Sequence, residues 1–585
     1  MLPLKKIQNW MKENKKDIFI INRTDEFLSE YIAPYAERLK WISNFSGSAG
    51  RAIIEHNKAF IFIDGRYTNQ ANKELDLNFF EIKHLKDYWL NIEKYKSQNM
   101  TVIIDPLLHS VNEIEKIKRI FYKTKVELNF LEQNPIDKYW NDQPKYPNSK
   151  VFLHDKKYSG ESSIKKIKKL QEIIQKKSLD FYLLNSLDSI AWLLNIRGDD
   201  IEYTPVVCCY LIIPSNGKIE LFIDSFKIEH LLNDLTKLVN FNSFKNINAY
   251  ILSIDKKKIV GLDEKSTPYY FKKFCKNKGL IVNHFDNPCV YLKAIKNKTE
   301  ISGAKDANLR DGVSITKFIF WIKNKMKIKE TDEQKAAAYL LKLRKKNYLF
   351  YSLSFETISA FSSNSALPHY RVTKDSNLKF RNNSIYLVDS GAQYKDGTTD
   401  ITRTVIIGNA TSEQKDRFTR VLKGHIAIAK AVFPIGTKGS ELDPIARKSL
   451  QEINCDYDHG TGHGIGSFLS VHEGPQRIAK SAGQSDGILK DGMIISNEPG
   501  YYKKDEYGIR TENLIVCRFQ KKNTLFFETI SWAPIDIELI NISLLDEQEI
   551  EWINNYHNKV YKKISPNLSI EEKNWLKSVV SPLIK

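Results

Sequence analysis

The sequence has few cysteines and lacks a long hydrophobic run. Only six of its 585 residues are cysteines, and they include the adjacent pair Cys208 and Cys209 but no CxxC motif. This spacing favours neither a disulfide framework nor a thiolate zinc site, so we expect free thiols in a reducing compartment. The longest apolar runs, at 206–213 and 318–322, are far shorter than the roughly 18 residues that cross a bilayer. We therefore expect no membrane association.

The N-terminal residues also lack the features of a secretory signal, because no apolar segment precedes a small-residue cleavage site. A cytoplasmic location is the resulting expectation. The chain carries Lys+Arg 89 against Asp+Glu 70, a net charge of +19. An excess of this sign can mark a nucleic-acid-binding surface. Here, however, lysines are spread along the whole chain and no basic cluster alternates with aromatic residues, so the sequence predicts no nucleic-acid partner.

What is present is the composition of a soluble globular protein, with 42% apolar and 27% charged residues. The length corresponds to about three domains of roughly 100–200 residues each. A short repeat occurs in the first half of the chain. WISNFSG at 41–47 precedes β-like segments that end in FIDGRY at 62–67, and WLLNIRG at 192–198 precedes β-like segments that end in FIDSFK at 222–227. This common order predicts two duplicated α/β domains.

Hydrophobic periodicity predicts several local elements. We expect helices at 28–39, 163–177, 300–324 and 417–433, strands at 52–55 and 59–64, and a polar linker at 134–150. Apolar residues at helical spacing predict a helix around 550–564 in the tail, and a capping box from Ser569 to Glu572 opens a second one. The predicted parts of the chain are 1–145, 146–288, 289–540 and a helical tail at 541–585.

Four acids and one histidine in the third part have the character of metal ligands. They are Asp389 in IYLVD, Asp400 in DGTTD, His463 in HGTGHGIG, Glu498 in ISNEPG and Glu512 in GIRTEN. Each acid lies at or beside the end of a β-like segment, and strand pairing can bring such positions together because neighbouring strands are about 4.8 Å apart. Five such residues in apolar or glycine-rich surroundings are hard to explain as surface charges.

The donor set favours hard divalent ions. Four carboxylates and one imidazole without sulfur suit two ions such as Mn²⁺. Two ions bring four positive charges and the carboxylates four negative ones, which leaves a bridging hydroxide as the nucleophile. Paired metals would lower the pKa of that water and polarise a carbonyl group. The sequence therefore predicts a dinuclear hydrolytic centre with two divalent ions, Mn²⁺ being the metal we expect.

Four of the twelve histidines fall within about a hundred residues: His369, His459, His463 and His472. His459 and His463 are four residues apart, as in the HExxH zinc helix, but the intervening Gly-Thr-Gly strongly disfavours a helix. The zinc helix is therefore excluded. His369 follows a proline and stands beside the other candidates in the sequence, and from the residues alone both a catalytic and a structural role stay open for it.

These motifs resemble those of a known family. HGTGHGIGSFLSVHEGP at 459–475, the Asp389 and Asp400 pair, NEPGYY at 497–502 and GIRTEN at 508–513 look like the dinuclear M24 metallopeptidases, which include methionine aminopeptidase, prolidase, aminopeptidase P and creatinase. The resemblance is strongest to the long, three-domain cytosolic form of aminopeptidase P. It extends to the first domain, to the second domain and to the tail, through the segments at 41–67, 187–198 and 554–561.

The resemblance implies an α/β (α+β) fold, with a pita-bread catalytic domain behind two creatinase-like α/β domains and a short helical tail. It also implies ligand roles at the matching positions. Asp389 would hold one metal, and His463 with Glu498 would hold the other. Asp400 and Glu512 would bridge the two ions. Every ligand position of the family is present in this sequence.

The resemblance further implies catalytic and substrate-binding roles. His472 would stabilise the developing gem-diolate and move protons, and His369 would contact the substrate near the scissile bond. His459, Tyr502 and Arg510 would shape the pocket for proline, and Arg510 would also support the metal ligands.

The implied activity is hydrolysis of the N-terminal Xaa-Pro bond of peptides by a homodimeric enzyme. A close alternative is prolidase, which cuts Xaa-Pro dipeptides, but the long chain, the duplicated front and the helical tail favour aminopeptidase P. A metal-free creatinase-like hydrolase is disfavoured because all five ligands are present. A non-catalytic binding module, such as a histone-binding peptidase-like domain, is disfavoured for the same reason.

Overall fold

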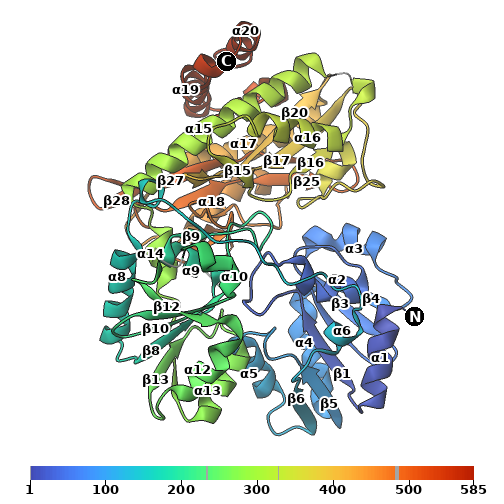
Figure 1. Ribbon diagram of the computed structural model, residues 1–585. Helices are drawn as coiled ribbons and strands as arrows, with labels where there is room; N and C mark the ends of the chain where they lie inside the picture. The colour runs from blue at the N-terminus through green and yellow to red at the C-terminus, as the bar shows by residue number, and fades with distance from the viewer. Residues whose placement is uncertain (1, 232–234, 327, 481–485) are drawn as a thin grey trace. The chain divides into compact units, whose positions relative to one another are not determined.

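The computed structural model describes residues 2–231, 235–326, 328–480 and 486–585 (Figure 1). The chain divides into two compact units, the first comprising Met1–His154 with Glu161–Cys289 and the second Asp155–Gly160 with Val290–Lys585. Within the described ranges, no helix has both the length and the apolar character needed to cross a membrane. The four predicted parts of the chain, divided at 145/146, 288/289 and 540/541, stay predictions.

The first unit contains two six-stranded sheets of the same topology. The strands of the first sheet, in spatial order, are β4 (Phe80–His84), β3 (Ala59–Ile63), β2 (Arg51–Ile54), β1 (Ile18–Asn22), β5 (Met100–Ile104) and β6 (Val126–Phe130). Those of the second sheet are β12 (Val239–Ser243), β11 (Ile219–Ile223), β10 (Tyr210–Pro214), β8 (Phe181–Leu184), β13 (Ile259–Leu262) and β14 (Ile281–His284).

The two sheets also share their strand directions. In each, the first three strands in chain order pair antiparallel, and every further neighbour pairs parallel. Alternate residues of β1 belong to two different apolar clusters, Phe19 and Ile21 to one, Ile18 and Ile20 to the other. Side chains on both faces of this sheet are therefore buried, which explains the continuous apolar sequence IFII. The predicted duplication of an α/β domain is confirmed.

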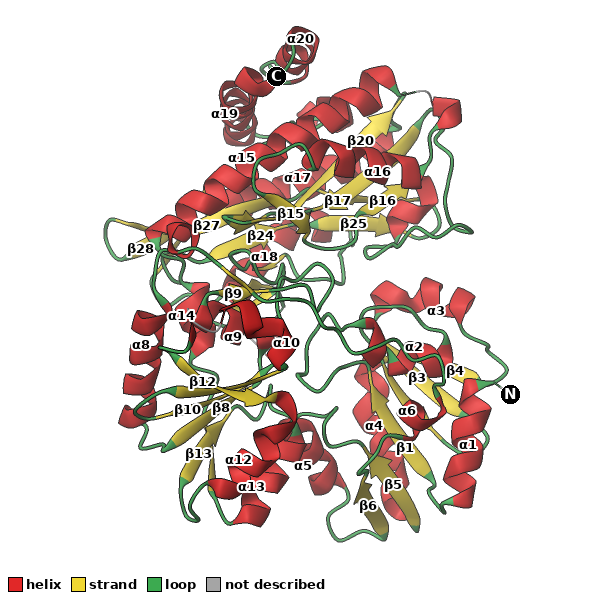
Figure 2. Ribbon diagram, in the orientation of Figure 1, coloured by secondary structure: helices red, strands yellow, loops and turns green. Residues whose placement is uncertain are grey.

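Several local predictions are also confirmed. The strands predicted at 52–55 and 59–64 correspond to β2 and β3, and the helices predicted at 163–177 and 300–324 to α8 (Ser163–Lys176) and α15 (Lys298–Phe320). Figure 2 shows α8 as a long helix beside the second sheet. The helix predicted at 417–433 begins and ends earlier, as α17 (Ser412–Ala429), and is followed by strand β21 (Val432–Pro434).

One prediction for the first unit was wrong, and another is confirmed only for 140–150, which form neither helix nor strand. Residues 28–37 form no α-helix, and only α2 (Arg38–Ser43) follows a short 3₁₀ turn at Pro34–Ala36. Proline lacks the N–H that a helix interior needs, and the Asp25 carboxylate instead accepts hydrogen bonds from the amides of Phe27 and Ser29, which holds a turn. The predicted linker at 134–150 contains the helix α6 (Pro135–Tyr139), which Asn134 caps.

The second unit combines short sheets with long helices. One sheet contains β15 (Phe350–Leu353), β18 (Ala392–Tyr394) and β19 (Gly397–Thr398), and a second contains β16 (Ile358–Phe361), β17 (Ser384–Ser390) and β20 (Ile401–Ile407). The third sheet contains, in spatial order, β21, β28 (Thr524–Thr529), β27 (Asn513–Gln520), β24 (Ile494–Asn497), β22 (Gly462–Gly464) and β23 (Glu473–Ile478). The strands β25 (Gly500–Lys503) and β26 (Tyr507–Arg510) form a hairpin. Helix α15 runs along these sheets, accompanied by α16 (Glu333–Arg344), α17 and α18 (Gly439–Gln451) (Figure 1).

The tail forms α19 (Glu547–Ile564) and α20 (Ile570–Val579), as predicted, and the capping box of Ser569 and Glu572 is present. Its apolar stripe packs on its own unit, in one cluster with Val313 of α15 and Trp532. The ring centroids of Phe320 and Trp575 lie 5.5 Å apart. The stripe is thus buried within the chain. Formation of a homodimer through the tail stays a prediction.

Candidate metal centre

Three of the predicted ligands converge at the junction of several strands. Asp400, His463 and Glu512 each offer a ligand atom, and these atoms all lie within 4.8 Å of one another. Asp400 directly precedes β20, His463 is the central residue of β22, and Glu512 lies between β26 and β27. The main-chain amide of Glu512 donates to the carbonyl oxygen of Thr402, which joins this turn to β20.

The other two predicted ligands adjoin this group. His463 Nε2 lies 3.4 Å from Glu498 Oε1 and 3.5 Å from Asp400 Oδ2. Asp389 lies on β17 opposite Thr402 of β20. Its Oδ2 accepts a hydrogen bond of 2.5 Å from Arg510 Nη2, while its Oδ1 is buried without a hydrogen-bond partner among the described residues.

The crowded carboxylates raise each other's pKa. Burial raises the pKa of Asp389 to about 6, opposed by Arg510 and reinforced by the negative charges of Asp400 and Glu498. Burial, together with the negative charges of Asp400, Asp389 and Glu498, raises the pKa of Glu512 well above its ordinary value. Burial opposes protonation of His463, but the carboxylates of Asp400 and Glu498 raise its pKa to about 9. Negative charge at this place exceeds what the surrounding protein neutralises.

This arrangement fits divalent cations. The donors are oxygen and imidazole nitrogen, the set that suits hard divalent metals. A cation would satisfy the orphaned Oδ1 of Asp389 and offset the repulsion among the carboxylates. The predicted ligands are therefore a plausible metal set in their chemistry as well as their position.

One predicted catalytic histidine lies against a predicted ligand. The rings of His472 and His463 lie edge to face, with centroids 4.3 Å apart. His472 stands in a bend directly before β23. His459 Nε2 lies 2.8 Å from Tyr502 Oη, which accepts a hydrogen bond of 2.5 Å from Arg510 Nη1. Tyr502 thus connects His459 to the Arg510 guanidinium.

His369 is half-buried and follows Pro368. The carbonyl oxygen of Pro368 accepts a hydrogen bond of 3.3 Å from Arg510 Nη2. Arg510 therefore contacts Asp389, Tyr502 and the main chain next to His369. One guanidinium thus joins a predicted metal ligand to one predicted substrate-binding residue and to the neighbour of another.

Two hydroxyl residues that support the ligands were missed from the sequence. Thr402 Oγ1 donates to Glu512 Oε2 at 2.7 Å and accepts from Arg510 Nε at 3.2 Å. Ser496 Oγ accepts from the main-chain amide of His463 at 2.9 Å and donates to Glu498 Oε1 at 3.2 Å. Thr402 and Ser496 each stand two residues from a predicted ligand, a spacing that in extended chain places side chains on one face. That spacing was the available signal.

Family models match most of the chain. Residues 3–129 and 142–300 each match a model described as the Creatinase/Prolidase N-terminal domain, residues 303–518 match Metallopeptidase family M24, and residues 523–583 match the C-terminal region of peptidase_M24. A probable Xaa-Pro aminopeptidase P from Laccaria bicolor is 38% identical, over 99% of this chain and 93% of that protein. The chain belongs to the Xaa-Pro aminopeptidase P group of metallopeptidase family M24.

Solved structures agree with this assignment. One is an X-prolyl aminopeptidase from Caenorhabditis elegans, which is described as a cytosolic enzyme with a di-nuclear active site. It is 31% identical with a TM-score of 0.91, and the match covers 97% of this chain and 95% of the C. elegans chain. Prolidase from Pyrococcus horikoshii OT3 is 25% identical with a TM-score of 0.51, and covers 63% of this chain and 99% of its own. Similarity to an Xaa-Pro aminopeptidase therefore extends over nearly the whole chain, and the expected creatinase-like and pita-bread fold is confirmed.

Proposed function

We propose that this protein hydrolyses the N-terminal Xaa-Pro bond of peptides with the help of two divalent metal ions. The observation that carries the proposal is the convergence of Asp400, His463 and Glu512 in a chain that matches Xaa-Pro aminopeptidases over its full length. The adjoining Glu498 and Asp389 supply the remaining carboxylates that a pair of ions needs.

In this proposal Asp389 would hold one ion, His463 and Glu498 would hold the other, and Asp400 and Glu512 would serve both. When bound, the ions lower the pKa of a water molecule and polarise the scissile carbonyl group. We assign Mn²⁺ as the preferred ion, because the donors are four carboxylates and a single imidazole. Loading requires loss of the proton that the carboxylates favour on His463.

In this proposal His472 and His369 act on the substrate, and Arg510 supports a metal ligand. His472, whose ring is 4.3 Å from that of His463, stabilises the developing negative charge and transfers a proton to the leaving nitrogen. His369 contacts the substrate near the scissile bond. Arg510 neutralises one oxygen of Asp389 and leaves the other for a cation, so it sets both the charge and the orientation of that ligand.

Selectivity for proline comes from shape. The bond before proline is a tertiary amide without an N–H, so no donor is available there for recognition. A pocket bounded by His459, Tyr502 and Arg510, which are connected by hydrogen-bond distances of 2.8 and 2.5 Å, is held rigid enough to fit a pyrrolidine ring.

Prolidase activity is the second candidate, because the prolidase fold matches 63% of this chain. The two activities differ in substrate length, since a dipeptidase has to recognise the free carboxylate of Xaa-Pro. The test is the release of free arginine from Arg-Pro-Pro and from Arg-Pro by protein that has been chelated and reloaded with Mn²⁺, with Arg-Ala-Ala as the control. We expect Arg-Pro-Pro to be cut fastest and Arg-Ala-Ala to resist cleavage. A strong preference for Arg-Pro would assign the protein as a prolidase.

Assembly and location complete the proposal. We propose a cytoplasmic homodimer, with two creatinase-like domains at 1–145 and 146–288, a catalytic domain at 289–540 and the tail at 541–585. The location is supported by the C. elegans relative, which is described as cytosolic. Sedimentation of the full chain at micromolar concentration measures its mass, and a monomer there would contradict the dimer.

A further inference from the structure

A fully buried ion pair lies next to the end of the strand that carries the predicted metal ligand Asp389. The side chains of Arg344 on α16 and Asp311 on α15 are 0% and 2% exposed. Two parallel hydrogen bonds join them, from Arg344 Nε to Asp311 Oδ1 at 2.7 Å and from Nη2 to Oδ2 at 2.8 Å. Removing two charges from water is costly, and a pair in this position is often no more stabilising than apolar residues would be. Its presence here therefore calls for a reason other than stability.

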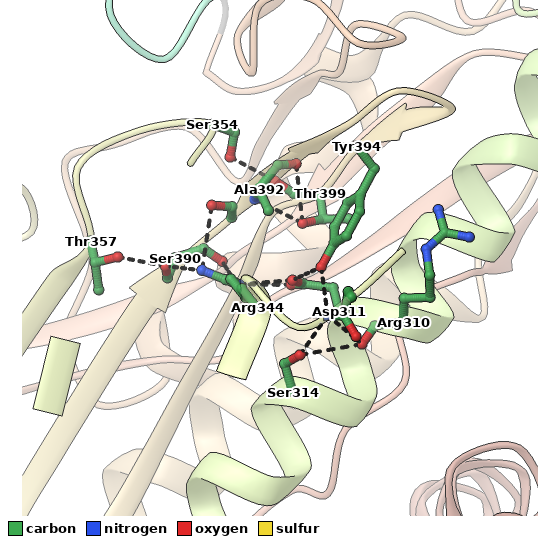
Figure 3. Close-up of polar contacts among 12 residues, drawn as sticks. Arg310, Asp311, Ser314, Arg344, Ser354, Thr357, Ser390, Ala392, Tyr394 and Thr399 are labelled. Carbon is green, nitrogen blue, oxygen red and sulfur yellow. Dashed lines mark hydrogen bonds and ion pairs between the residues drawn. The ribbon is translucent and has the colours of Figure 1, made fainter. Parts of the chain in front are cut away.

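The remaining donors of Arg344 point at the end of β17. Nη1 donates to the hydroxyl of Ser390 and, at 3.4 Å, to the carbonyl oxygen of Gly391, and Nη2 donates to the carbonyl oxygen of Ser390 at 3.1 Å (Figure 3). Thr357 Oγ1 lies 2.7 Å from Ser390 Oγ. Ser390 and Gly391 directly follow Asp389 in the chain. The hydrogen bonds from Arg344 therefore hold the main chain next to that predicted ligand.

The same short stretch is tied to the residue before Asp400. The amide of Ala392 donates to Thr399 Oγ1 at 2.9 Å, and the amide of Thr399 donates to the carbonyl oxygen of Ala392 at 2.8 Å. A Cβ added to Gly391 would fall 1.9 Å from the carbonyl oxygen of Thr399. The chain segments next to Asp389 and Asp400 are therefore in direct contact, and no side chain fits between them.

Asp311 holds the tip of this hairpin from the other side. Its Oδ1 accepts a hydrogen bond of 3.0 Å from Tyr394 Oη, and Asn347 Nδ2 donates to the same Tyr394 oxygen at 3.1 Å (Figure 3 shows Tyr394 directed at Asp311). Two helices therefore fix both the base and the tip of the segment between the two ligands.

We propose that the Arg344–Asp311 pair is a positioning device that holds Asp389 and Asp400 at the separation two metal ions need. The proposal rests on the assignment of these two acids as ligands. Arg344 is suited to the task because its planar fork binds Asp311 through two parallel hydrogen bonds and the Ser390 carbonyl at the same time, whereas the ammonium group of a lysine is a compact point charge without this fork geometry.

The test compares Arg344→Lys with the parent in metal affinity, in the folding midpoint Tm and in steady-state kinetics. Chelated protein is titrated with Mn²⁺ by calorimetry and with Co²⁺ by visible absorption. We expect Arg344→Lys to stay folded, to bind at least one ion about 10- to 100-fold more weakly and to change the Co²⁺ spectrum, as for other groups that orient ligands. At saturating metal, kcat should fall while KM for Arg-Pro-Pro changes little.

A matched control is Arg38→Lys. Arg38 forms a similar fork with Asp137 in the first unit, with hydrogen bonds of 2.8 and 3.0 Å. This variant should lower Tm without changing metal affinity, which separates a structural effect from positioning. Parental Kd values and an unchanged Co²⁺ spectrum in folded Arg344→Lys would overturn the proposal.

Tyr394→Phe keeps the inference testable if Arg344→Lys does not fold. It removes the hydroxyl that donates to Asp311 Oδ1 and leaves the Arg344–Asp311 pair in place. We expect weaker metal binding, and parental metal affinity would overturn the proposal. If the parent itself bound fewer than two ions, the proposed function would fail instead, so the two failures are distinguishable.

Discussion

Arg403 Nη2 of β20 donates a hydrogen bond of 2.8 Å to Tyr556 Oη of the C-terminal helix α19. Both side chains are buried. The same guanidinium donates through Nη1 to the main-chain carbonyl oxygen of Glu512 at 2.6 Å. One arginine therefore links the tail to the main chain of a predicted bridging ligand.

The first prediction concerns this link. Tyr556→Phe should lower the free energy of unfolding by about 1.5–3 kcal/mol, the range for a hydrogen bond to a charged donor. It should keep both metals, because Arg403 retains its bond to Glu512.

Truncation after Ile542 should instead give aggregating protein, since it exposes the apolar cluster of the second unit. Thermal unfolding, size-exclusion chromatography and metal analysis measure these outcomes. A soluble, fully active truncated protein would show that the tail is dispensable.

The second prediction separates two neighbouring histidines. His472→Ala should keep both metals and lose roughly 10²–10⁴ in kcat, as expected for removal of a proton-transfer group, which corresponds to about 3–5 kcal/mol. His463→Ala should lose metal affinity. Metal stoichiometry and kcat are measured in parallel on both variants. Loss of a metal from His472→Ala would make that residue a ligand, and near-normal kcat would make it structural.

The third prediction concerns the charge of the centre. Asp400 contributes to the raised pKa of Asp389, Glu498 and Glu512. In chelated protein at pH 8, Asp400→Asn should therefore have a Tm equal to or above that of the parent, because repulsion is relieved. Added Mn²⁺ should raise the Tm and the activity of the parent alone, since a ligand stabilises only the state that binds it. Full activity of Asp400→Asn, or of chelated parent protein, would refute the metal mechanism.

The fourth prediction concerns acid stability. Burial, assisted by the positive charge of Arg403, lowers the pKa of His557 and of His425 to about 3. Their unfolded-state pKa is about 6.5. Between these values the unfolded chain binds protons that the folded chain does not, so stability falls as the pH drops from 6.5 toward 3 and is unaffected above. At pH 5 each histidine costs about 2 kcal/mol.

His557→Gln tests this directly, because glutamine can still accept the hydrogen bond that the Ile535 amide donates to His557. Tm is measured for parent and variant at pH 7.5 and 5, both with chelator so that the metal centre contributes equally. The variant should lose less Tm between the two pH values. Equal losses would mean that His557 does not contribute.

Local chemistry in the sequence was sufficient to predict much of this protein. The capping box at Ser569 forms because a side chain and an amide three residues apart meet in any helix start. The acids at strand ends converge because neighbouring strands end at a common edge, and the strand pairs that follow the two WxxNxxG segments belong to sheets of the same topology. The capping box depends on residues close in the chain, whereas the convergence of the acids depends on the pairing of strands that the sequence pattern predicts.

Only the tertiary structure decided how the ligands are held. Arg344 and Asp311 are 33 residues apart in the chain, and Arg403 and Tyr556 are 153 apart. Nothing in the local pattern distinguishes such an arginine from one on the surface, since its partners come from different helices and strands. The turn at 28–37 is of the same kind, because the apolar residues there suit a helix while the Asp25 carboxylate and Pro34 favour a turn. Burial makes these long-range hydrogen bonds strong enough to fix the ligand-bearing strands, and burial is a property of the folded chain as a whole.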